Sequence, residues 1–239
     1  MVQNGQITFY THVYSPYCHR VHIALEEAKA DYSCHTVIVQ DKPAWYISKV
    51  NPIGKIPAIT YGGPQAPPED PAPEAAKIPE SAVILEFLAE LFPEAKMLPS
   101  DPVLRAKARL FTIAAETHIL DGFKAFFLMH NEEAEKTLLD SLEAVQKRLP
   151  ESGFAVGEWS IADMATGPFL ARVDMLLKHD IGTFPAGEGL RVYEIVRGPR
   201  FARLMKYFED VKARPSFQST WDEELQMGIW KKNPAVQRK

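Results

Sequence analysis

The chain has few cysteines, no excess of positive charge and no long apolar run. Only 2 of its 239 residues are cysteine, too few for a disulfide framework, so a reducing compartment is expected. The net charge of −4 gives no support for binding nucleic acid or an anionic membrane. No apolar stretch approaches the roughly 20 residues of a membrane-spanning helix, and the polar residues 1–6 have no signal-peptide pattern. We therefore expect a soluble, cytoplasmic, globular protein.

Apolar residues make up 46% of the chain, enough for one large core or two modest ones. In the first part, short apolar runs alternate with helical patterns, which predicts parallel strands covered by helices. Strands are expected at residues 7–10, 33–39, 55–61 and 76–78, and helices at 16–28, 44–50 and 82–91, the last with Ser81 as its N-cap. The proline-rich residues 62–73 have no apolar period and predict an exposed loop.

The pattern becomes helical after residue 101. Ser160 and Asp163 have the spacing of a capping box at the start of one helix. The helices are predicted at residues 103–129, 132–149, 161–177, 200–213 and 216–230. Because prolines interrupt residues 92–102, we place a linker there, between a domain of residues 1–95 and a domain of residues 102–239.

One predicted helix start carries the most chemical information. Pro16 suits the first helical turn, where no backbone N–H is needed, so Ser15 is predicted to be the N-cap. A helix N-terminus stabilises an anion, including a thiolate. From these residues alone, two interpretations are open: Ser15 assists a thiolate, or Ser15 only caps the helix and Cys18 is a small buried residue.

Four segments together resemble the cytosolic glutathione transferases. They occur in the order of that family and span most of the chain: Ser15-Pro16-Tyr17-Cys18, residues 51–57 (Asn-Pro-Ile-Gly-Lys-Ile-Pro), Glu80-Ser81 and Ser160-Ile161-Ala162-Asp163. The resemblance implies an α/β, thioredoxin-like N-terminal domain that binds glutathione. It also implies an all-helical C-terminal domain that forms a hydrophobic substrate site, and a homodimer.

Two features bear on the class within that family. Residues 41–45, Asp-Lys-Pro-Ala-Trp, are similar to a pattern of the omega class. Omega enzymes carry cysteine where this chain has Ser15. Serine followed by proline, an aromatic residue and cysteine looks more like β-etherase-related bacterial enzymes and a fungal-specific relative of the omega class. The proline-rich loop is longer than in the omega pattern.

The resemblance also assigns roles toward glutathione, the co-substrate. Ser15 would stabilise the glutathione thiolate, and Tyr17 would line the pocket beside the sulfur or pack outward. Lys42 would pair with the glycyl carboxylate, although a solvated surface lysine is the competing interpretation.

Further along the chain, Pro57 resembles the cis-proline of the family, rather than a trans-proline at a strand start. The backbone of Ile56 would then pair with the cysteinyl unit like an added strand. Glu80 would accept from the γ-glutamyl ammonium, while Ser81 and its helix N-terminus would take the α-carboxylate. Alternatively, Ser81 is a helix cap and Glu80 an ordinary exposed residue.

Aromatic residues in the helical half have two interpretations. Phe123, Phe127 and Met129 lie at helical spacing, which favours core packing, although part of that face would suit a hydrophobic substrate site. No metal is expected, because Cys18, His19 and His22 lack a fourth ligand and fit helix packing better.

The predicted function is attack of the glutathione thiolate on hydrophobic, aromatic electrophiles, with peroxide reduction or ether cleavage as close variants. An alternative is a ligandin, a non-catalytic protein that binds hydrophobic or phenolic compounds. A third interpretation, omega-like thiol transfer, would need a reactive cysteine at position 15.

Overall fold

The computed structural model describes residues 6–238, and the chain divides into two compact units, Met1–Lys96 and Met97–Lys239. Most of the N-terminal segment for which no signal peptide was predicted, residues 1–5, lies outside the described residues.

The N-terminal unit is built on a four-stranded mixed sheet. The strands are β1 (Ile7–Thr11), β2 (Tyr32–Thr36), β3 (Ala58–Tyr61) and β4 (Ala76–Pro79), in the spatial order β2-β1-β3-β4. β1 and β2 are parallel, as the alternation of strand and helix predicted, whereas β3 runs antiparallel to both β1 and β4. This confirms the thioredoxin-like arrangement.

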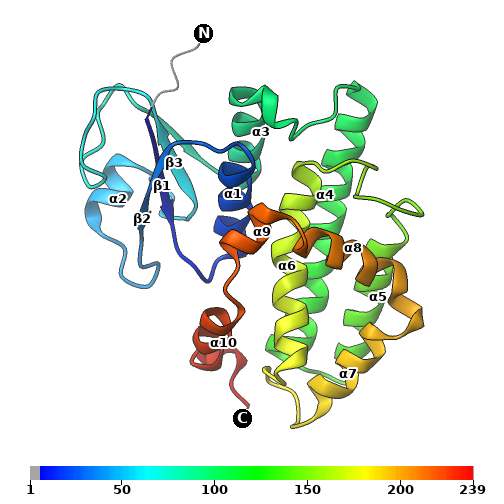
Figure 1. Ribbon diagram of the computed structural model, residues 1–239. Coiled ribbons are helices and arrows are strands. Elements are labelled where there is room, and N and C mark those ends of the chain that lie inside the picture. The colour runs from blue at the N-terminus through cyan, green and yellow to red at the C-terminus, as the bar shows by residue number, and fades with distance from the viewer. Residues whose placement is uncertain (1–5, 239) are drawn as a thin grey trace. The chain divides into compact units, whose positions relative to one another are not determined.

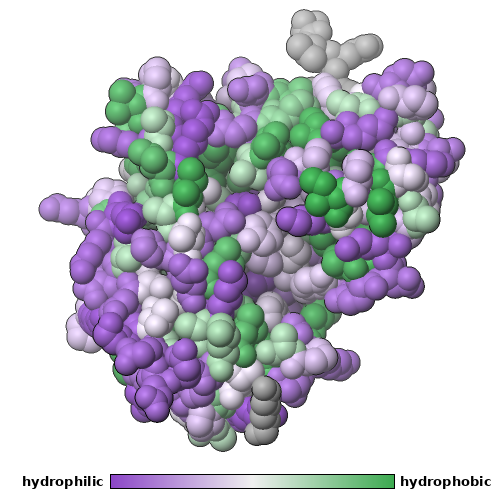
Figure 2. All heavy atoms as spheres, turned by 180° about the vertical axis from the view of Figure 1, so that it is seen from behind, coloured by the Kyte–Doolittle hydropathy of each residue, from purple (hydrophilic) through white to green (hydrophobic). Residues whose placement is uncertain are grey.

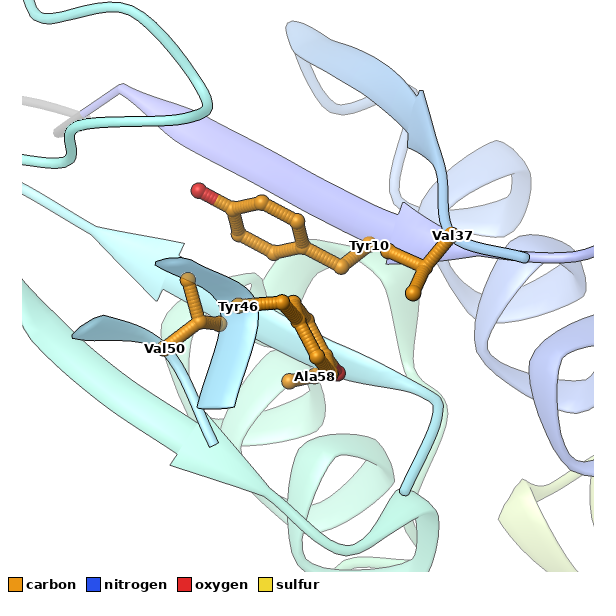
Figure 3. Close-up of a cluster of buried hydrophobic side chains, with 5 residues drawn as sticks. All are labelled: Tyr10, Val37, Tyr46, Val50 and Ala58. Carbon is orange, nitrogen blue, oxygen red and sulfur yellow. The ribbon is translucent and has the colours of Figure 1, made fainter. Parts of the chain in front are cut away.

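Helices cover both faces of the sheet. α2 (Ala44–Lys49) lies on one side, and α1 (Pro16–Glu27) and α3 (Ser81–Leu91) lie on the other (Figure 1). A buried cluster of Tyr10, Val37, Tyr46, Val50 and Ala58 fills the space between α2 and the sheet (Figure 3). Burial of this apolar surface holds α2 and its flanking loops in place.

Two predicted strands are shorter in the structure. β2 ends at Thr36, and the chain leaves the sheet soon after, so that Ile38 is exposed. β3 begins only at Ala58, directly after the cis peptide bond between Ile56 and Pro57. Residues 55–57 therefore form the approach to the strand rather than part of it.

The proline-rich loop is tied to the unit at several points. The Tyr10 hydroxyl donates to the Pro68 carbonyl oxygen at 2.7 Å, and Lys49 pairs with Asp70 at 2.9 Å. Lys77 donates to the carbonyl oxygen of Ala72 at 2.7 Å. The segment is thus an extended connection without helix or strand, as predicted, but one with fixed anchors.

The second unit is all-helical. Its helices are α4 (Pro102–Phe123), α5 (Ala134–Gln146), α6 (Ile161–Lys178), α7 (Glu188–Arg197), α8 (Ala202–Lys212), α9 (Pro215–Thr220) and α10 (Glu223–Lys231). Every residue of α6 from Ile161 to Leu177 is buried. The predicted capping box is present: Asp163 accepts from the Ser160 N–H at 2.8 Å, and Ser160 Oγ accepts from the Ala162 N–H at 3.3 Å.

Two helical predictions need correction, and one helix was missed. The helix predicted over 103–129 ends as α4 at Phe123 and continues as a π-helical segment, Lys124–Met129. The helix predicted over 216–230 is divided into α9 and α10, because Trp221 is extended and Asp222 caps a new start by accepting from Leu225 N–H. α7 was not predicted.

The start of α7 explains why it was missed. Gly187 precedes it with a φ of 87°, which an L side chain rarely adopts. The cap comes from a distant residue, since the Asp180 carboxylate accepts from the N–H groups of Gly187 and Gly189 at 2.9 and 3.0 Å.

No helix within residues 6–238 combines the length and apolar character needed to cross a bilayer. On the face shown in Figure 2, hydrophilic side chains predominate and hydrophobic ones occur in separate patches.

Candidate active site

Ser15 lies at the start of α1, in a tight turn after β1. The turn is closed by a hydrogen bond from the Ser15 N–H to the His12 carbonyl oxygen, 3.1 Å long. Ser15 Oγ accepts from the Cys18 N–H at 3.2 Å, so Ser15 is the N-cap of α1, as predicted. Accepting this bond leaves the hydroxyl hydrogen for another acceptor. The turn therefore sets a hydroxyl donor at the positive end of a helix.

The two aromatic side chains beside this turn are uncharged at neutral pH. Burial lowers the pKa of His12 below its ordinary value of 6.5. Burial also raises the pKa of Tyr14 above its ordinary value of 10.0. His12 therefore adds no positive charge beside Ser15 at neutral pH, and the N-terminus of α1 provides a favourable field for an anion there.

A buried arginine connects α1 with α3. The guanidinium of Arg20 donates to Ser81 Oγ from Nε at 2.9 Å and from Nη2 at 2.6 Å. Its Cζ lies 4.9 Å from the centre of the Tyr17 ring, so Tyr17 lies against this cation. Sequence reasoning missed Arg20, although its place on the buried face of an amphipathic helix was a signal.

Glu80 and Ser81 form the start of α3 in a different register from the predicted one. Glu80, not Ser81, is the N-cap, and Ser81 is the first helical residue. Glu80 is exposed and has a φ of 68°, unusual for a residue other than glycine. Ser81 is 4% exposed and contributes one of the N–H groups that the first helical turn leaves without a helical partner.

The loop before β3 is held by side chains that the sequence did not single out. The Asn51 side-chain amide donates to the Lys55 carbonyl oxygen at 2.8 Å and accepts from the Ile53 N–H at 3.1 Å. The Tyr46 hydroxyl donates to the same carbonyl oxygen at 2.7 Å. These bonds fix the backbone immediately before Ile56.

Lys42 lies against this loop. A Cβ placed on Gly54, whose φ is +70°, would be 3.3 Å from Lys42 Cδ and 3.7 Å from Nζ. The Lys42 ammonium is therefore beside the loop that leads to Ile56. The bond from Ile56 to Pro57 is cis, as the resemblance implied, and the Ile56 side chain packs against the cluster of Figure 3.

The contacts bring the predicted residues of this unit into two groups. Tyr17 and Ser81 meet through Arg20, and Tyr17 shares the first turn of α1 with the cap residue Ser15. Lys42 belongs with the loop of residues 51–57.

The residues considered for a metal site pack within the unit. Cys18 and His19 are buried, and the His22 ring lies 5.9 Å from Phe9 and 6.0 Å from Tyr32. Within residues 6–238, no three His, Cys, Asp or Glu side chains are grouped to hold a metal ion.

The three residues suggested for the hydrophobic site differ in exposure. Phe127 is fully buried and packs against Phe126 at 5.2 Å, so core packing accounts for it. Phe123 is half-buried and lies 5.7 Å from Trp230 of α10. Met129 is 72% exposed. Phe127 therefore cannot line an open site in this arrangement.

The chain is similar to solved glutathione transferases over 95–98% of its length. Residues 14–91 match the family model described as glutathione S-transferase, N-terminal domain. Glutathione transferase Omega 1C from Trametes versicolor is 44% identical with a TM-score of 0.90, covering 95% of each chain. Omega 2S from the same organism, solved in complex with 2,4-dihydroxybenzophenone, is 44% identical with a TM-score of 0.89, covering 98% of this chain and 99% of that one. Glutathione S-transferase DHAR2 of Arabidopsis thaliana is 30% identical over 69% of each chain.

A thioredoxin-like unit with a capped α1, together with an all-helical unit, defines the class of cytosolic glutathione transferases. The chain belongs to the glutathione transferase family, and within it to the omega-like members.

Proposed function

We propose that this chain is a serine-type glutathione transferase that conjugates glutathione to hydrophobic, aromatic electrophiles. The observation that carries this proposal is the position of Ser15, whose hydroxyl caps α1 and keeps its hydrogen for a further acceptor. Family membership supports glutathione as the co-substrate.

The chemistry requires a thiolate at neutral pH. A free thiol has a pKa of about 8.5, so only a few per cent is ionised. A hydrogen bond from Ser15 and the N-terminus of α1 lower that pKa by about one to two units. The thiolate sulfur then forms a bond to an electrophilic carbon of the second substrate, and the leaving group departs with its electron pair.

Further residues of the same unit would bind glutathione. Lys42, beside the loop at Gly54, pairs with the glycyl carboxylate. The backbone of Ile56, before the cis Pro57, pairs with the cysteinyl unit. Glu80 accepts from the ammonium of the γ-glutamyl unit, and Ser81 donates to its α-carboxylate.

Tyr17, two residues after Ser15 in the first turn of α1, would lie close to the glutathione sulfur. In the proposed transferase, the domain of residues 1–95 binds glutathione, and the helical domain of residues 102–239 shapes the hydrophobic site. Phe123 and Met129 are the candidates for that site, since each has exposed surface. Reduction of peroxides and cleavage of activated ethers would use the same thiolate.

A second candidate function is non-catalytic binding of phenolic compounds, as in a ligandin. It is favoured by the complex of Trametes versicolor Omega 2S with 2,4-dihydroxybenzophenone, at 44% identity to this chain. Turnover of substrate distinguishes a transferase from a ligandin. Conjugation of aryl and benzyl electrophiles with glutathione supports the transferase, whereas tight binding of dihydroxybenzophenone without any turnover supports the ligandin.

The scarcity of cysteine supports a reducing, cytoplasmic location. A homodimer, implied by the family resemblance, is tested by light scattering.

A further inference from the structure

In the contact between Arg20 and Ser81, arginine is the hydrogen-bond donor and the serine hydroxyl oxygen is the acceptor. Arg20 is 3% exposed, and Ser81 is 4% exposed. Two N–H groups of one guanidinium meet a single oxygen, at 2.9 Å from Nε and 2.6 Å from Nη2. The planar fork of arginine allows both bonds at once, which the single ammonium of lysine does not reproduce.

These two bonds determine what the Ser81 hydroxyl can still do. A hydroxyl has two acceptor lone pairs and one hydrogen to donate. Since Arg20 occupies both lone pairs, only the hydrogen remains for a ligand. Ser81 can therefore donate to a carboxylate but cannot accept from an ammonium.

The electrostatics favour the same partner. An arginine side chain stays charged at every physiological pH. Its charge lies next to the first turn of α3, where the N–H groups and the helix dipole also attract an anion. The positive charge and the direction of the hydrogen bond thus both favour a carboxylate beside Ser81.

We propose that Arg20 is a positioning residue that fixes the Ser81 hydroxyl as a donor, so that the site selects γ-glutamyl thiols with a free α-carboxylate. This inference rests on the proposed function, in which Ser81 binds the γ-glutamyl end of glutathione. The role of Arg20 is exerted through Ser81 and through its charge, not on the reacting sulfur.

The test compares three thiols by calorimetric titration. They are glutathione, 4-aminobutyryl-cysteinylglycine, which lacks the α-carboxylate, and glutaryl-cysteinylglycine, which lacks the amino group. The wild type is expected to bind the first at least about tenfold more tightly than the second, because charge-assisted hydrogen bonds are lost. In Arg20→Gln that ratio should fall below about threefold, while the ratio of glutathione to the glutaryl compound stays as in the wild type.

Each ratio is measured within one variant, so general damage to the fold does not produce the expected pattern. Lys49→Gln is the matched control, since it removes a cation of the same unit that pairs with Asp70. It should keep the wild-type ratios. If Arg20→Gln does not fold, Arg20→Lys is used, and a ratio reduced at least threefold supports the proposal.

Failure of the proposed function, of the carboxylate role of Ser81 and of the role of Arg20 would each give a different result. A wild type that does not bind glutathione overturns the proposed function. A wild type that binds glutathione and the decarboxylated analogue equally overturns the carboxylate role of Ser81, and the inference with it. A carboxylate preference that persists undiminished in Arg20→Gln, or in Arg20→Lys where that variant is used, overturns only the role of Arg20.

Discussion

The side-chain nitrogen of Asn51 and the carbonyl oxygen of Lys55 lie 2.8 Å apart, across the turn that leads to Ile56. Asn51 is 1% exposed, and the same carbonyl oxygen also accepts from the Tyr46 hydroxyl at 2.7 Å. Two buried side chains thus hold one peptide group just before the backbone proposed to bind the cysteinyl unit.

Asn51→Ala removes one of these bonds and the bond from the Ile53 N–H. We expect the free energy of unfolding to fall by about 1–3 kcal/mol, since buried partners lose their hydrogen bonds. Glutathione affinity should fall about tenfold because the loop is no longer fixed. Urea unfolding and calorimetry check both values. Ser48→Ala, at an exposed position of α2, is the control, and equal losses in the two variants would contradict this account.

Lys42→Met should weaken recognition of the glycyl carboxylate. The expected rise in KM for glutathione is about three- to fivefold, as for a partly exposed ion pair. With γ-glutamylcysteine, which lacks the glycyl unit, KM should be unchanged. Lys49→Met is the matched control. An equal rise with both thiols would show that Lys42 acts on the loop at Gly54 rather than on the carboxylate.

Asp163 should make stability depend on pH. Burial raises the pKa of its carboxyl group to about 6, although the N–H groups of Ala155 and Ser160 donate to it. The folded state then holds a proton that the unfolded state releases near pH 4, so stability falls as pH rises from about 4 to about 6. The loss is on the order of 1–3 kcal/mol.

The variant Asp163→Asn tests whether this carboxyl group causes the pH dependence of stability. Its stability should be lower overall, because the amide replaces one acceptor oxygen. The contribution of position 163 to the fall in stability between pH 4 and 6 should disappear. Ser160→Ala, which weakens the same cap and keeps the carboxyl group, should retain the slope. An unchanged slope in Asp163→Asn would assign the dependence to other groups.

Local patterns predicted the parts of the fold that local forces determine. The Ser15 cap, the Pro16 start and the Ser160–Asp163 capping box depend on residues within one turn, so their spacing was enough. The division between α9 and α10 was missed, since apolar spacing continues across Trp221 while the backbone there is extended.

Residues of the candidate site could be predicted from the sequence only where they belong to a recognisable motif. The contact between Arg20 and Ser81 joins residues 61 positions apart, and no periodicity indicates that pairing. The register of α3 depends on the positive φ of Glu80, which the motif Glu80-Ser81 does not encode. For Phe127, helical spacing was compatible with both the core and a pocket, and it could not distinguish them. In the structure the Phe127 side chain is buried in the core.

Ser15→Cys should change the reaction. A thiol at the N-terminus of α1 would have a lowered pKa and would attack a glutathione mixed disulfide, taking up the glutathionyl group and releasing the other thiol. A second glutathione then regenerates the thiol and leaves as glutathione disulfide. The variant should gain this activity, and mass spectrometry should find the adduct at position 15. An adduct on Cys18 instead would revive a thiol-transfer role for that buried residue.

The role of Ser15 as the stabiliser of the thiolate is tested by the pH dependence of conjugation by the wild type and by Ser15→Ala, with glutathione and a panel of aryl and benzyl electrophiles. The wild type should show an apparent thiol pKa about one to two units below that of free glutathione. Ser15→Ala should raise this pKa toward the free value and slow conjugation at neutral pH. Identical pH–rate profiles for the two proteins would contradict the role of Ser15 as the stabiliser of the thiolate.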